Sequence, residues 1–407
     1  MTTGTSKQSL RKLGPALVAG VAYLDPGNFA SNLASGALFK YSLIWVVLVA
    51  NLFAWFVQYL AAKLAIGTGQ SLTELIAHRS TRLSRWAYWA QAEIVVLATE
   101  TAEVVGGAVA LNILFNIPLG LGAAITAAAS MVILSSKGRL RGTFTAIIIG
   151  LTAVTALGIV ASIQFGNIDL SALWQGLVPR LRSQSELLIS LGIFGATVMP
   201  HAIYSHSAFV RDKFGKVDSV AAKRVLLRVS RIDVTIALAI AGLVNLCILL
   251  VGATILSGSN SADPIYATFS RLAASASPVL AVLFAVALLA SGLASSTVGA
   301  YAGSEVMNSL IKHRVAPWLR RAITVVPAIL ILQFAANPTT ALLWSQVFIS
   351  FGIPFALIPL LRLTSAKKLM AELTNRRLTI WAGVLVSAIL IALNLKFVFD
   401  ALTGLGA

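Results

Sequence analysis

The sequence predicts an all-α polytopic membrane protein with eleven transmembrane helices. Of its 407 residues, 58% are hydrophobic and only 11% are charged, and the mean hydropathy is +0.87. Soluble domains hold about 25% charged residues, so this composition excludes an ordinary soluble protein. Apolar runs of roughly 18 residues or more recur along the chain, the length that a helix needs to cross about 30 Å of hydrocarbon.

The expected spans follow one another with short connections. No connection is long enough for a separate soluble domain, so we expect a single transmembrane domain over residues 1–407. The first run continues past the length of a signal-peptide core and is expected to be retained. The eleven spans are 13–36, 41–66, 87–114, 119–136, 143–163, 186–210, 232–256, 277–310, 317–336, 340–361 and 378–399.

The basic residues predict the orientation. Lys and Arg mark cytoplasmic loops, so the N-terminus is expected in the cytoplasm of a plasma (inner) membrane protein, and an odd number of spans places the C-terminus outside. The net charge of +17 is then explained by orientation and contact with anionic lipid, and not by nucleic acid. Of the 31 Lys and Arg, 25 lie in the segments 1–12, 67–86, 137–142, 211–231, 311–321 and 362–377.

Two spans share an interruption. Pro26 lies within Asp25-Pro26-Gly27-Asn28 in the first span, and Pro200 within Val198-Met199-Pro200-His201 in the sixth. Proline removes a backbone donor, and non-helical backbone at that depth survives only where it is buried or lines a cavity. Matching breaks five spans apart predict a transporter of inverted repeats, about 13–163 and 186–361, with 378–399 as an additional span. The alternative is a pair of ordinary proline kinks.

The polar residues at these breaks form a candidate metal site. Asp25 falls near the middle of its span, where an ionised carboxylate costs about 2.5 to 3.5 kcal/mol and needs a partner or a proton. Asn28 offers a neutral oxygen and Met199 a thioether. Oxygens with one sulfur suit manganese or ferrous iron better than magnesium or calcium. The alternatives are that Met199 fills the core and that Asn28 caps a helix.

These residues also carry a resemblance to a known family. Asp25-Pro26-Gly27-Asn28 with Met199-Pro200-His201 resembles the paired signature of the Nramp family of divalent-metal transporters, which carry manganese and iron with protons. The resemblance implies a leucine-transporter-like fold. It also implies that the metal is held by Asp25, Asn28, Met199 and the carbonyl of Ala196, with Gln346 joining when the site is occluded. The similarity extends to Ala98–Glu103, Tyr301–Gly303, Ser345–Val347 and Pro354–Pro359.

The chain departs from the family pattern at four positions, which concern gating and selectivity. Some relatives carry magnesium and lack the methionine, so Met199 favours the transition-metal branch. A magnesium transporter of the same family stays an alternative, as does a symporter of the same fold for an organic substrate. The four departures are Ala202, Ser205, Leu293 and Gly352.

An acidic stripe in the third span bears on proton movement. Glu93 and Glu100 are nearly in line on a helix, and Glu103 lies on a neighbouring part of that face. Arg320 and Arg321 are the expected partners. The resemblance implies a proton exit route through this stripe, and the alternative is a static ion-pair network.

Coupling is expected to begin at the metal site itself. A carboxylate that binds a cation must release its proton, so Asp25 is the expected coupling residue. His201 adjoins the second break and is either a proton relay or a packing residue. His206 is five residues from His201, about 140° around a helix, so the two do not form a chelating pair.

The remaining function classes lack support in the sequence. A membrane metalloenzyme would need a His-Glu-x-x-His pattern or a nucleophile with its base, and neither is evident. A metal-sensing receptor would need a soluble domain to pass on its signal. The single Cys247 excludes an internal disulfide. We therefore expect no cofactor and no enzyme activity, with divalent metal ions, protons and lipids as partners and no obligate protein partner.

Overall fold

The computed structural model describes residues 14–139, 141–163, 168–257, 263–312, 315–334 and 337–403, and the regular structure in these ranges is helical. The elements, in order, are α2 (Pro15–Gly20), η1 (Val21–Leu24), α3 (Pro26–Phe39), α4 (Ile44–Thr68), α5 (Leu72–Arg79), α6 (Arg82–Phe115), α7 (Leu119–Arg139), α8 (Arg141–Ser162), α9 (Leu170–Gln175), α10 (Gln184–Thr197), α11 (Pro200–Phe214), α12 (Val220–Ile255), α13 (Pro264–Arg271), η3 (Leu272–Ala276), α14 (Pro278–Leu310), α15 (Pro317–Phe334), α16 (Pro338–Ser365), α17 (Lys367–Met370), η4 (Ala371–Leu373) and α18 (Arg377–Thr403).

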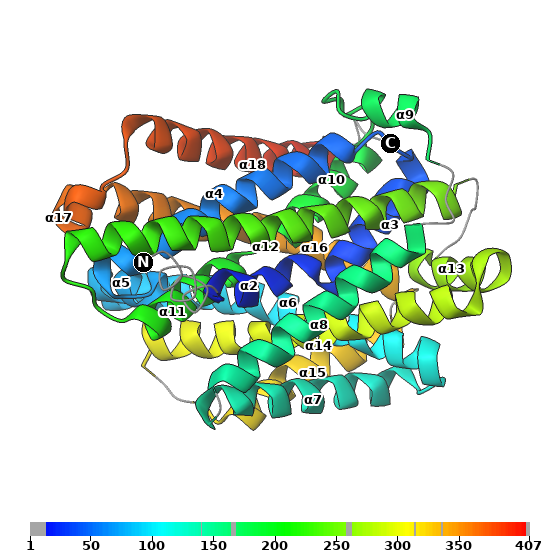
Figure 1. Ribbon diagram of the computed structural model, residues 1–407, viewed down its shortest axis with the longest axis horizontal. Coiled ribbons are helices and arrows are strands. Elements are labelled where there is room, and N and C mark those ends of the chain that lie inside the picture. Colours follow the sequence, from blue (N-terminus) through cyan, green and yellow to red (C-terminus); the bar gives the residue numbers. More distant parts are fainter. Residues whose placement is uncertain are drawn as a thin grey trace, which may run out of the picture.

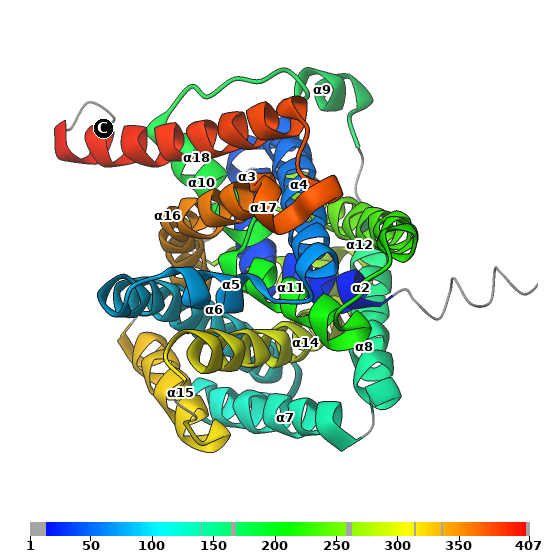
Figure 2. The same ribbon diagram turned by 90° about the vertical axis from the view of Figure 1, so that its left-hand side faces the viewer.

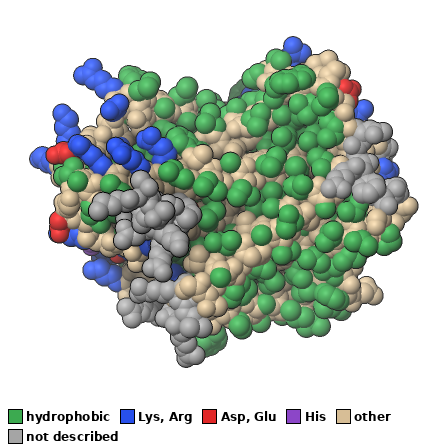
Figure 3. Space-filling model, viewed as in Figure 1, with side chains coloured by type: hydrophobic (Ala, Val, Ile, Leu, Met, Phe, Trp, Pro, Cys, Tyr) green, Lys and Arg blue, Asp and Glu red, His purple; other side chains and the backbone are tan. Residues whose placement is uncertain are grey.

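Many of these helices are built to cross a membrane. In the described part of the chain, nine helical stretches are long and apolar enough to do so, with α10 and α11 together forming one of them. Pro15–Leu24 is a further, shorter apolar helix. Hydrophobic side chains cover the middle of the molecule, and Lys and Arg gather mainly at the end that carries α5 and α17 (Figures 1 and 3). The prediction of an all-α polytopic membrane protein is confirmed.

The interrupted helices occupy the centre of the bundle. Most of the long helices run along the longest axis of the molecule (Figure 1). Seen end-on, α3, α10 and α11 lie at the middle, with α18 at one margin and α7 at the opposite margin (Figure 2). The most extensive contacts of α3 are with α12, those of α10 are with α16, and those of α6 are with α14. The two breaks are therefore enclosed by other helices.

Both interruptions have the same local construction. Asp25 (φ −76°, ψ 166°) and Met199 (φ −65°, ψ 128°) are extended, and each precedes a proline that occupies the first turn of the next helix. Proline fits this position because its missing N–H is one that a helix start leaves unpaired anyway. Pro26 and Pro200 therefore begin new half-helices instead of kinking continuous ones, so the proline-kink alternative is wrong.

Some helix limits differ from the predicted spans. α12 begins at Val220, twelve residues before the predicted 232, because the side chain of Ser219 accepts a hydrogen bond from the backbone N–H of Ala222 and starts the helix inside the basic segment. Thr81 caps α6 in the same way, through Ser84. Hydropathy locates the apolar part of a helix and not its capped end.

Two arginines of the basic segment 311–321 are buried. Arg320 and Arg321, which also fall in the predicted span 317–336, lie in the first turns of α15 and each is only 5% exposed. Buried charges need partners. Their partners, described below, explain why they are inside the protein.

A buried carboxylate fixes the start of α2. Asp233, on α12, accepts hydrogen bonds from the backbone N–H groups of Gly14 (3.0 Å) and Ala16 (2.9 Å) at its Oδ2. The first N–H groups of a helix have no partner within it, so a carboxylate at this position satisfies them. Asp233 thereby connects the first half-helix to α12.

Candidate metal site

The first break places a carboxylate in the middle of the bundle. Asp25 is fully buried and caps α3. Its Oδ1 accepts hydrogen bonds from the backbone N–H (2.8 Å) and the side-chain Nδ2 (2.7 Å) of Asn28. Its Oδ2 is buried without a hydrogen-bond partner among the described residues. A buried polar atom left unsatisfied costs roughly 1 to 3 kcal/mol, and more if charged, so this oxygen is open to a cation.

Asn28 connects the two breaks. Its Nδ2 also donates to the carbonyl oxygen of Ala196 at 2.9 Å, and Thr197 Oγ1 donates to its Oδ1 at 3.4 Å. The amide nitrogen therefore lies between a carboxylate from α3 and a carbonyl from α10. If the amide were reversed, its Oδ1 would face this space as a third oxygen. Carboxylate, amide and carbonyl oxygens are ligands for divalent cations.

Met199 brings a sulfur to the second break. It is fully buried and follows Ala196 by three residues, at the extended position before Pro200. Within the described ranges, no group of three or more His, Cys, Asp and Glu side chains is gathered as a metal site. A metal held at the breaks would therefore take a mixed set of one carboxylate, neutral oxygens and a thioether.

Gln346 of α16 lies against the first break. A Cβ placed on Gly27 would be 2.1 Å from Gln346 Nε2 and 2.8 Å from Asp25 Oδ2, so both side chains approach the same point. Gln346 Oε1 is a second buried acceptor without a partner in the described part of the chain. Glycine at position 27 is what allows this approach. The structure thus brings Asp25, Asn28, Ala196 and Gln346 together, with Met199 at the adjoining break.

The acidic stripe and the two arginines form a compact ion network. Arg320 Nη2 lies 2.7 Å from Glu100 and 3.1 Å from Glu93, and Arg321 Nη1 lies 3.2 Å from Glu100. Arg321 also donates to the hydroxyl of Ser130 on α7. The predicted pairing of the third-span glutamates with these arginines is therefore seen for Glu93 and Glu100, and it joins α6, α7 and α15.

Glu103 stands apart from the arginines. Its Oε1 lies 3.7 Å from His201 Nε2, too long for a hydrogen bond, and neither carboxylate oxygen has a hydrogen-bond partner among the described residues. One turn further along α6, a Cβ on Gly106 would be 2.0 Å from the Pro26 ring. The stripe therefore meets the first break through Glu103 and Gly106. His201 connects it with the second break.

His206 points to a different set of partners. Its Nδ1 lies 2.6 Å from Gln58 Oε1, and Gln58 Nε2 donates to the Tyr23 hydroxyl. The two histidines therefore have different surroundings, as their spacing predicted. Neither forms part of a chelating pair in this structure.

Two supporting residues had weak signals in the sequence. Asn245 Nδ2 donates to the carbonyl of Tyr23 at 2.9 Å, and the Ser291 hydroxyl donates to the carbonyl of Leu24. Both satisfy backbone oxygens that the first break releases from the helix. An asparagine in an apolar run is a visible signal, because a polar side chain at that depth needs a hydrogen-bond partner. Ser291 is one of several small polar residues in its span and could not be singled out.

Comparisons with known proteins identify the family of the chain. Residues 16–400 match the family described as Nramp, natural resistance-associated macrophage protein-like. The divalent metal cation transporter MntH of Mycobacterium tuberculosis is 46% identical over 405 residues, which cover 99% of this chain and 94% of that protein. The protein of the same name from Bacillus subtilis is 39% identical over 391 residues, covering 95% and 92%.

Solved structures give the same result. A manganese transporter of Eremococcus coleocola is 31% identical, with a TM-score of 0.86 over 97% of this chain and 87% of that one. Mhp1, a nucleobase-cation-symport-1 family transporter, is 16% identical with a TM-score of 0.57 over 95% and 91%, which shows a shared fold alone. The resemblance stated from the paired Asp-Pro-Gly-Asn and Met-Pro-His motifs is confirmed, and with it the class of transporter over that of enzyme: the chain belongs to the Nramp family.

Proposed function

We propose that this protein imports divalent transition-metal ions, manganese and ferrous iron first among them, together with protons and by alternating access. The observation that carries the proposal is the unsatisfied Oδ2 of Asp25 at the first break, on a carboxylate whose Oδ1 shares the Asn28 amide with the carbonyl of Ala196 at the second break. The relatives named divalent metal cation transporter and manganese transporter support the same substrate class.

Each proposed ligand has a distinct role. Asp25 supplies the negative charge, and Asn28 and the Ala196 carbonyl supply neutral oxygens. Met199 supplies the soft ligand that separates transition metals from magnesium and calcium, which prefer oxygen. Gln346 replaces a water molecule when the site closes. When the metal ion binds, the Asn28 amide gives up its hydrogen bonds to Asp25 and to the Ala196 carbonyl. The ion then takes the place of the amide nitrogen as the partner of these oxygens.

The proposed architecture is eleven spans in two inverted repeats. The first span is α2, η1 and α3, and the sixth is α10 and α11. The two spans have the same break, an extended residue before a proline at the next helix start. The repeats are about 13–163 and 186–361 within a single domain, 1–407, and α18 is the additional span. Ion sites at half-helix ends near the midplane are typical of this arrangement.

The proposed setting is the plasma (inner) membrane with the N-terminus in the cytoplasm and the C-terminus outside. Of the described basic segments, those around α5 and α17 lie at one end of the molecule, where Lys and Arg gather (Figure 3). That end is the cytoplasmic one by the positive-inside rule.

The proposed proton route starts at Asp25. Metal binding favours its ionised form, and the proton passes toward His201 and Glu103 and then to Glu100 and Glu93, whose charges Arg320 and Arg321 balance. Glu103 is suited to take a proton because no arginine contacts it. At about 100 mV, inside negative, each inward charge gains about 2.3 kcal/mol, so a divalent ion gains about 4.6 kcal/mol. Metal uptake therefore runs without a fixed proton ratio.

Uptake into proteoliposomes with an interior pH dye tests the proposal. The parent protein should take up manganese, leave excess magnesium outside and acidify the interior. Met199→Ala should admit magnesium or calcium, because the remaining ligands are oxygens. If neither ion moves, or if magnesium enters the parent as readily as manganese, the transition-metal proposal is wrong.

A further inference from the structure

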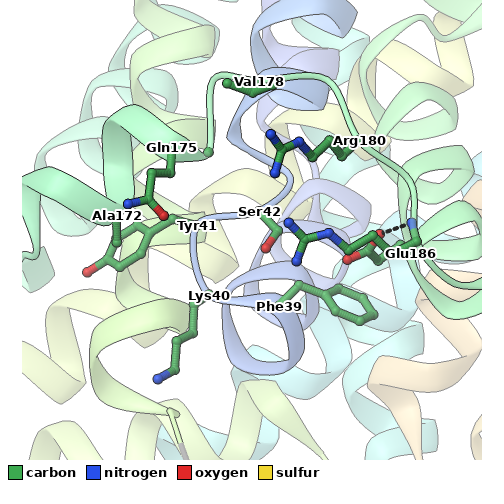
Figure 4. Close-up of a pocket in the computed structure, with 11 residues that line it drawn as sticks. Phe39, Lys40, Tyr41, Ser42, Ala172, Gln175, Val178, Arg180 and Glu186 are labelled. Carbon is green, nitrogen blue, oxygen red and sulfur yellow. Dashed lines mark hydrogen bonds between the residues drawn. The ribbon is translucent and has the colours of Figure 1, made fainter.

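A pocket at one end of the molecule is lined by unpaired cations. The cavity is about 430 Å³ and lies between the α3–α4 corner, the segment that contains α9, and the start of α10 (Figure 4). Lys40, Arg180 and Arg182 line it, and none of their side chains forms an ion pair or a hydrogen bond with the described residues. All three side chains are exposed, and the Lys40 ammonium group points away from the Arg180 guanidinium (Figure 4), so the two arginines are the cations that an anion in the cavity would contact.

The one acidic residue of the lining does not neutralise these cations. Glu186 is buried, and its Oε2 accepts a hydrogen bond from the backbone N–H of Arg182 at 2.5 Å. Its own backbone N–H is bound by the Ser183 hydroxyl at 3.1 Å. This carboxylate therefore serves as a cap at the start of α10. The Arg180 side chain points toward the chain of the α3–α4 corner, above Ser42 in the view of Figure 4.

The walls of the pocket are fixed to each other. The backbone N–H of Trp45 donates to the carbonyl of Gly176 at 3.1 Å, and the backbone N–H of Asp169 donates to the Tyr41 hydroxyl at 3.2 Å. A Cβ on Gly176 would be 2.1 Å from the Tyr41 carbonyl oxygen, so only glycine allows the two segments to meet. The cavity is therefore preformed, which lowers the entropy lost when a ligand binds.

We propose that this pocket is a binding site for a small polyanion that carries carboxylate or phosphate groups. Guanidinium groups bind these groups through two parallel hydrogen bonds, and Arg180 and Arg182 supply two of them. A free divalent cation would be repelled, so the pocket is not the metal entrance. The ligand is either a soluble polycarboxylate or phosphate, or the phosphate headgroup of an anionic lipid.

The position of the pocket relates it to the metal site. α3 runs from Pro26 at the first break to Phe39 at the pocket, and α10 runs from Gln184 at the pocket to Thr197 at the second break. Each helix has 14 residues, or about 21 Å at 1.5 Å per residue. A bound anion would thus join the far ends of both half-helices. That this end faces outward rests on the proposed topology, whereas binding itself does not.

Calorimetric titration of the purified protein in neutral detergent tests the site. The probes are citrate, inorganic phosphate and a short-chain phosphatidylglycerol, with short-chain phosphatidylcholine as the uncharged-headgroup control. Arg180→Gln combined with Arg182→Gln should weaken binding by at least about 100-fold, because two charged hydrogen-bond donors are lost. Arg271→Gln is the matched control, since Arg271 donates to the Ile255 carbonyl away from the pocket and should leave binding unchanged.

The probes decide between the two sources of the anion. Binding of citrate or phosphate that the double substitution abolishes supports a soluble ligand. Phosphatidylglycerol binding that it abolishes supports a lipid headgroup. The proposal is overturned if no anionic probe binds, or if the double variant binds as the parent does. Manganese uptake is measured separately, so a failed binding result leaves the proposed function standing and a failed uptake result leaves the binding result standing.

Lys40 gives a second test that separates binding from folding. Its backbone is at φ 51°, ψ −116°, a conformation that glycine adopts more easily and that costs other residues about 1 to 3 kcal/mol. The Lys40 ammonium group points away from Arg180 (Figure 4), so Lys40→Gly should weaken anion binding by less than about tenfold, while the unfolding temperature does not fall. Unchanged anion affinity in this variant would exclude Lys40 from the site.

Discussion

Two regions in the middle of the bundle bury carboxylates in opposite ways. In the network of α6 and α15, Glu93 and Glu100 meet Arg320 and Arg321 at 2.7 to 3.2 Å, and the four charges cancel. At the first break, Asp25 has only the Asn28 amide groups as partners, and its Oδ2 has none among the described residues. The network is balanced in charge, although Glu93 Oε2 and Arg320 Nε and Nη1 lack hydrogen-bond partners among the described residues. Asp25 has no positive partner among them, so its charge favours a cation that enters and leaves.

Glu103 shares its helix with the paired glutamates but, like Asp25, forms no ion pair with an arginine among the described residues. Its nearest basic group is His201 at 3.7 Å. Because no arginine among the described residues lies within ion-pair distance of it, Glu103 is the proposed position where a proton is gained and lost. The comparison therefore predicts three different responses to substitution, one for each region.

The largest effect, on the free energy of unfolding, is expected when the charge-balanced network of α6 and α15 loses an arginine. Arg321→Met leaves Glu100 with one arginine fewer in a buried position, and removal of one member of a buried ion pair costs about 3 to 5 kcal/mol. Unfolding in detergent should show this loss. Arg82→Met, at an exposed arginine at the start of the same helix as the glutamates, should change stability by less than about 0.5 kcal/mol. Equal stability of the two variants would show that the network does not hold the helices together.

The next effect is expected at the first break. Asp25→Asn removes the negative charge while keeping an oxygen that can cap α3, so the fold should persist and manganese uptake should fall by about 100-fold or more, about 2.7 kcal/mol. Asp169→Asn is the matched control, because Asp169 caps the exposed helix α9. Manganese uptake by the Asp25 variant at the parent rate would remove the carboxylate from the mechanism.

A smaller effect tests the approach of Gln346 to the site. Gly27→Ala places a methyl group 2.1 Å from Gln346 Nε2, so the glutamine must move, and uptake should fall by about tenfold, or 1.4 kcal/mol. Adding Gln346→Ala should restore part of the uptake by removing the clash. If adding Gln346→Ala lowers uptake further, the loss of Gln346 as a ligand reduces uptake more than relief of the clash restores it.

The smallest effect on metal movement is expected at Glu103. Glu103→Gln retains the shape of the side chain and touches no arginine pair, so manganese uptake should change by less than about tenfold. Acidification of the liposome interior should fall more than uptake does, because a glutamine does not carry a proton. Glu93→Gln serves as the comparison within the charge-balanced network. Parallel loss of metal and proton movement in the Glu103 variant would contradict a separate proton route.

The sequence predicted the features that depend on local chemistry. Proline beside Asp25 and Met199 located both breaks, and hydropathy located the spans. Pairing between distant helices was harder. Helical spacing gave the stripe of Glu93, Glu100 and Glu103, but it could not say which glutamate lacks an arginine, because this depends on how α15 packs against α6.

Contacts between a side chain and a distant backbone segment could not be predicted from the sequence for the same reason. The approach of Gly106 to Pro26 joins residues 80 positions apart, and a glycine in an apolar helix carries no sign of its partner. The role of Asp233 carries no local signal either, since the N–H groups that it binds lie more than 200 positions away. The start of α12 was missed because a serine cap, and not apolarity, determines it.

The contact between Asp233 and the start of α2 holds the first half-helix against α12. If the first half-helix moves outward in the proposed cycle, the backbone N–H groups of Gly14 and Ala16 both lose their hydrogen bonds to the buried Asp233 carboxylate. If these hydrogen bonds persist instead, α12 must move together with α2. This contact includes none of the proposed metal ligands, so a change at Asp233 would alter how firmly α2 is held without altering the groups that would bind the ion.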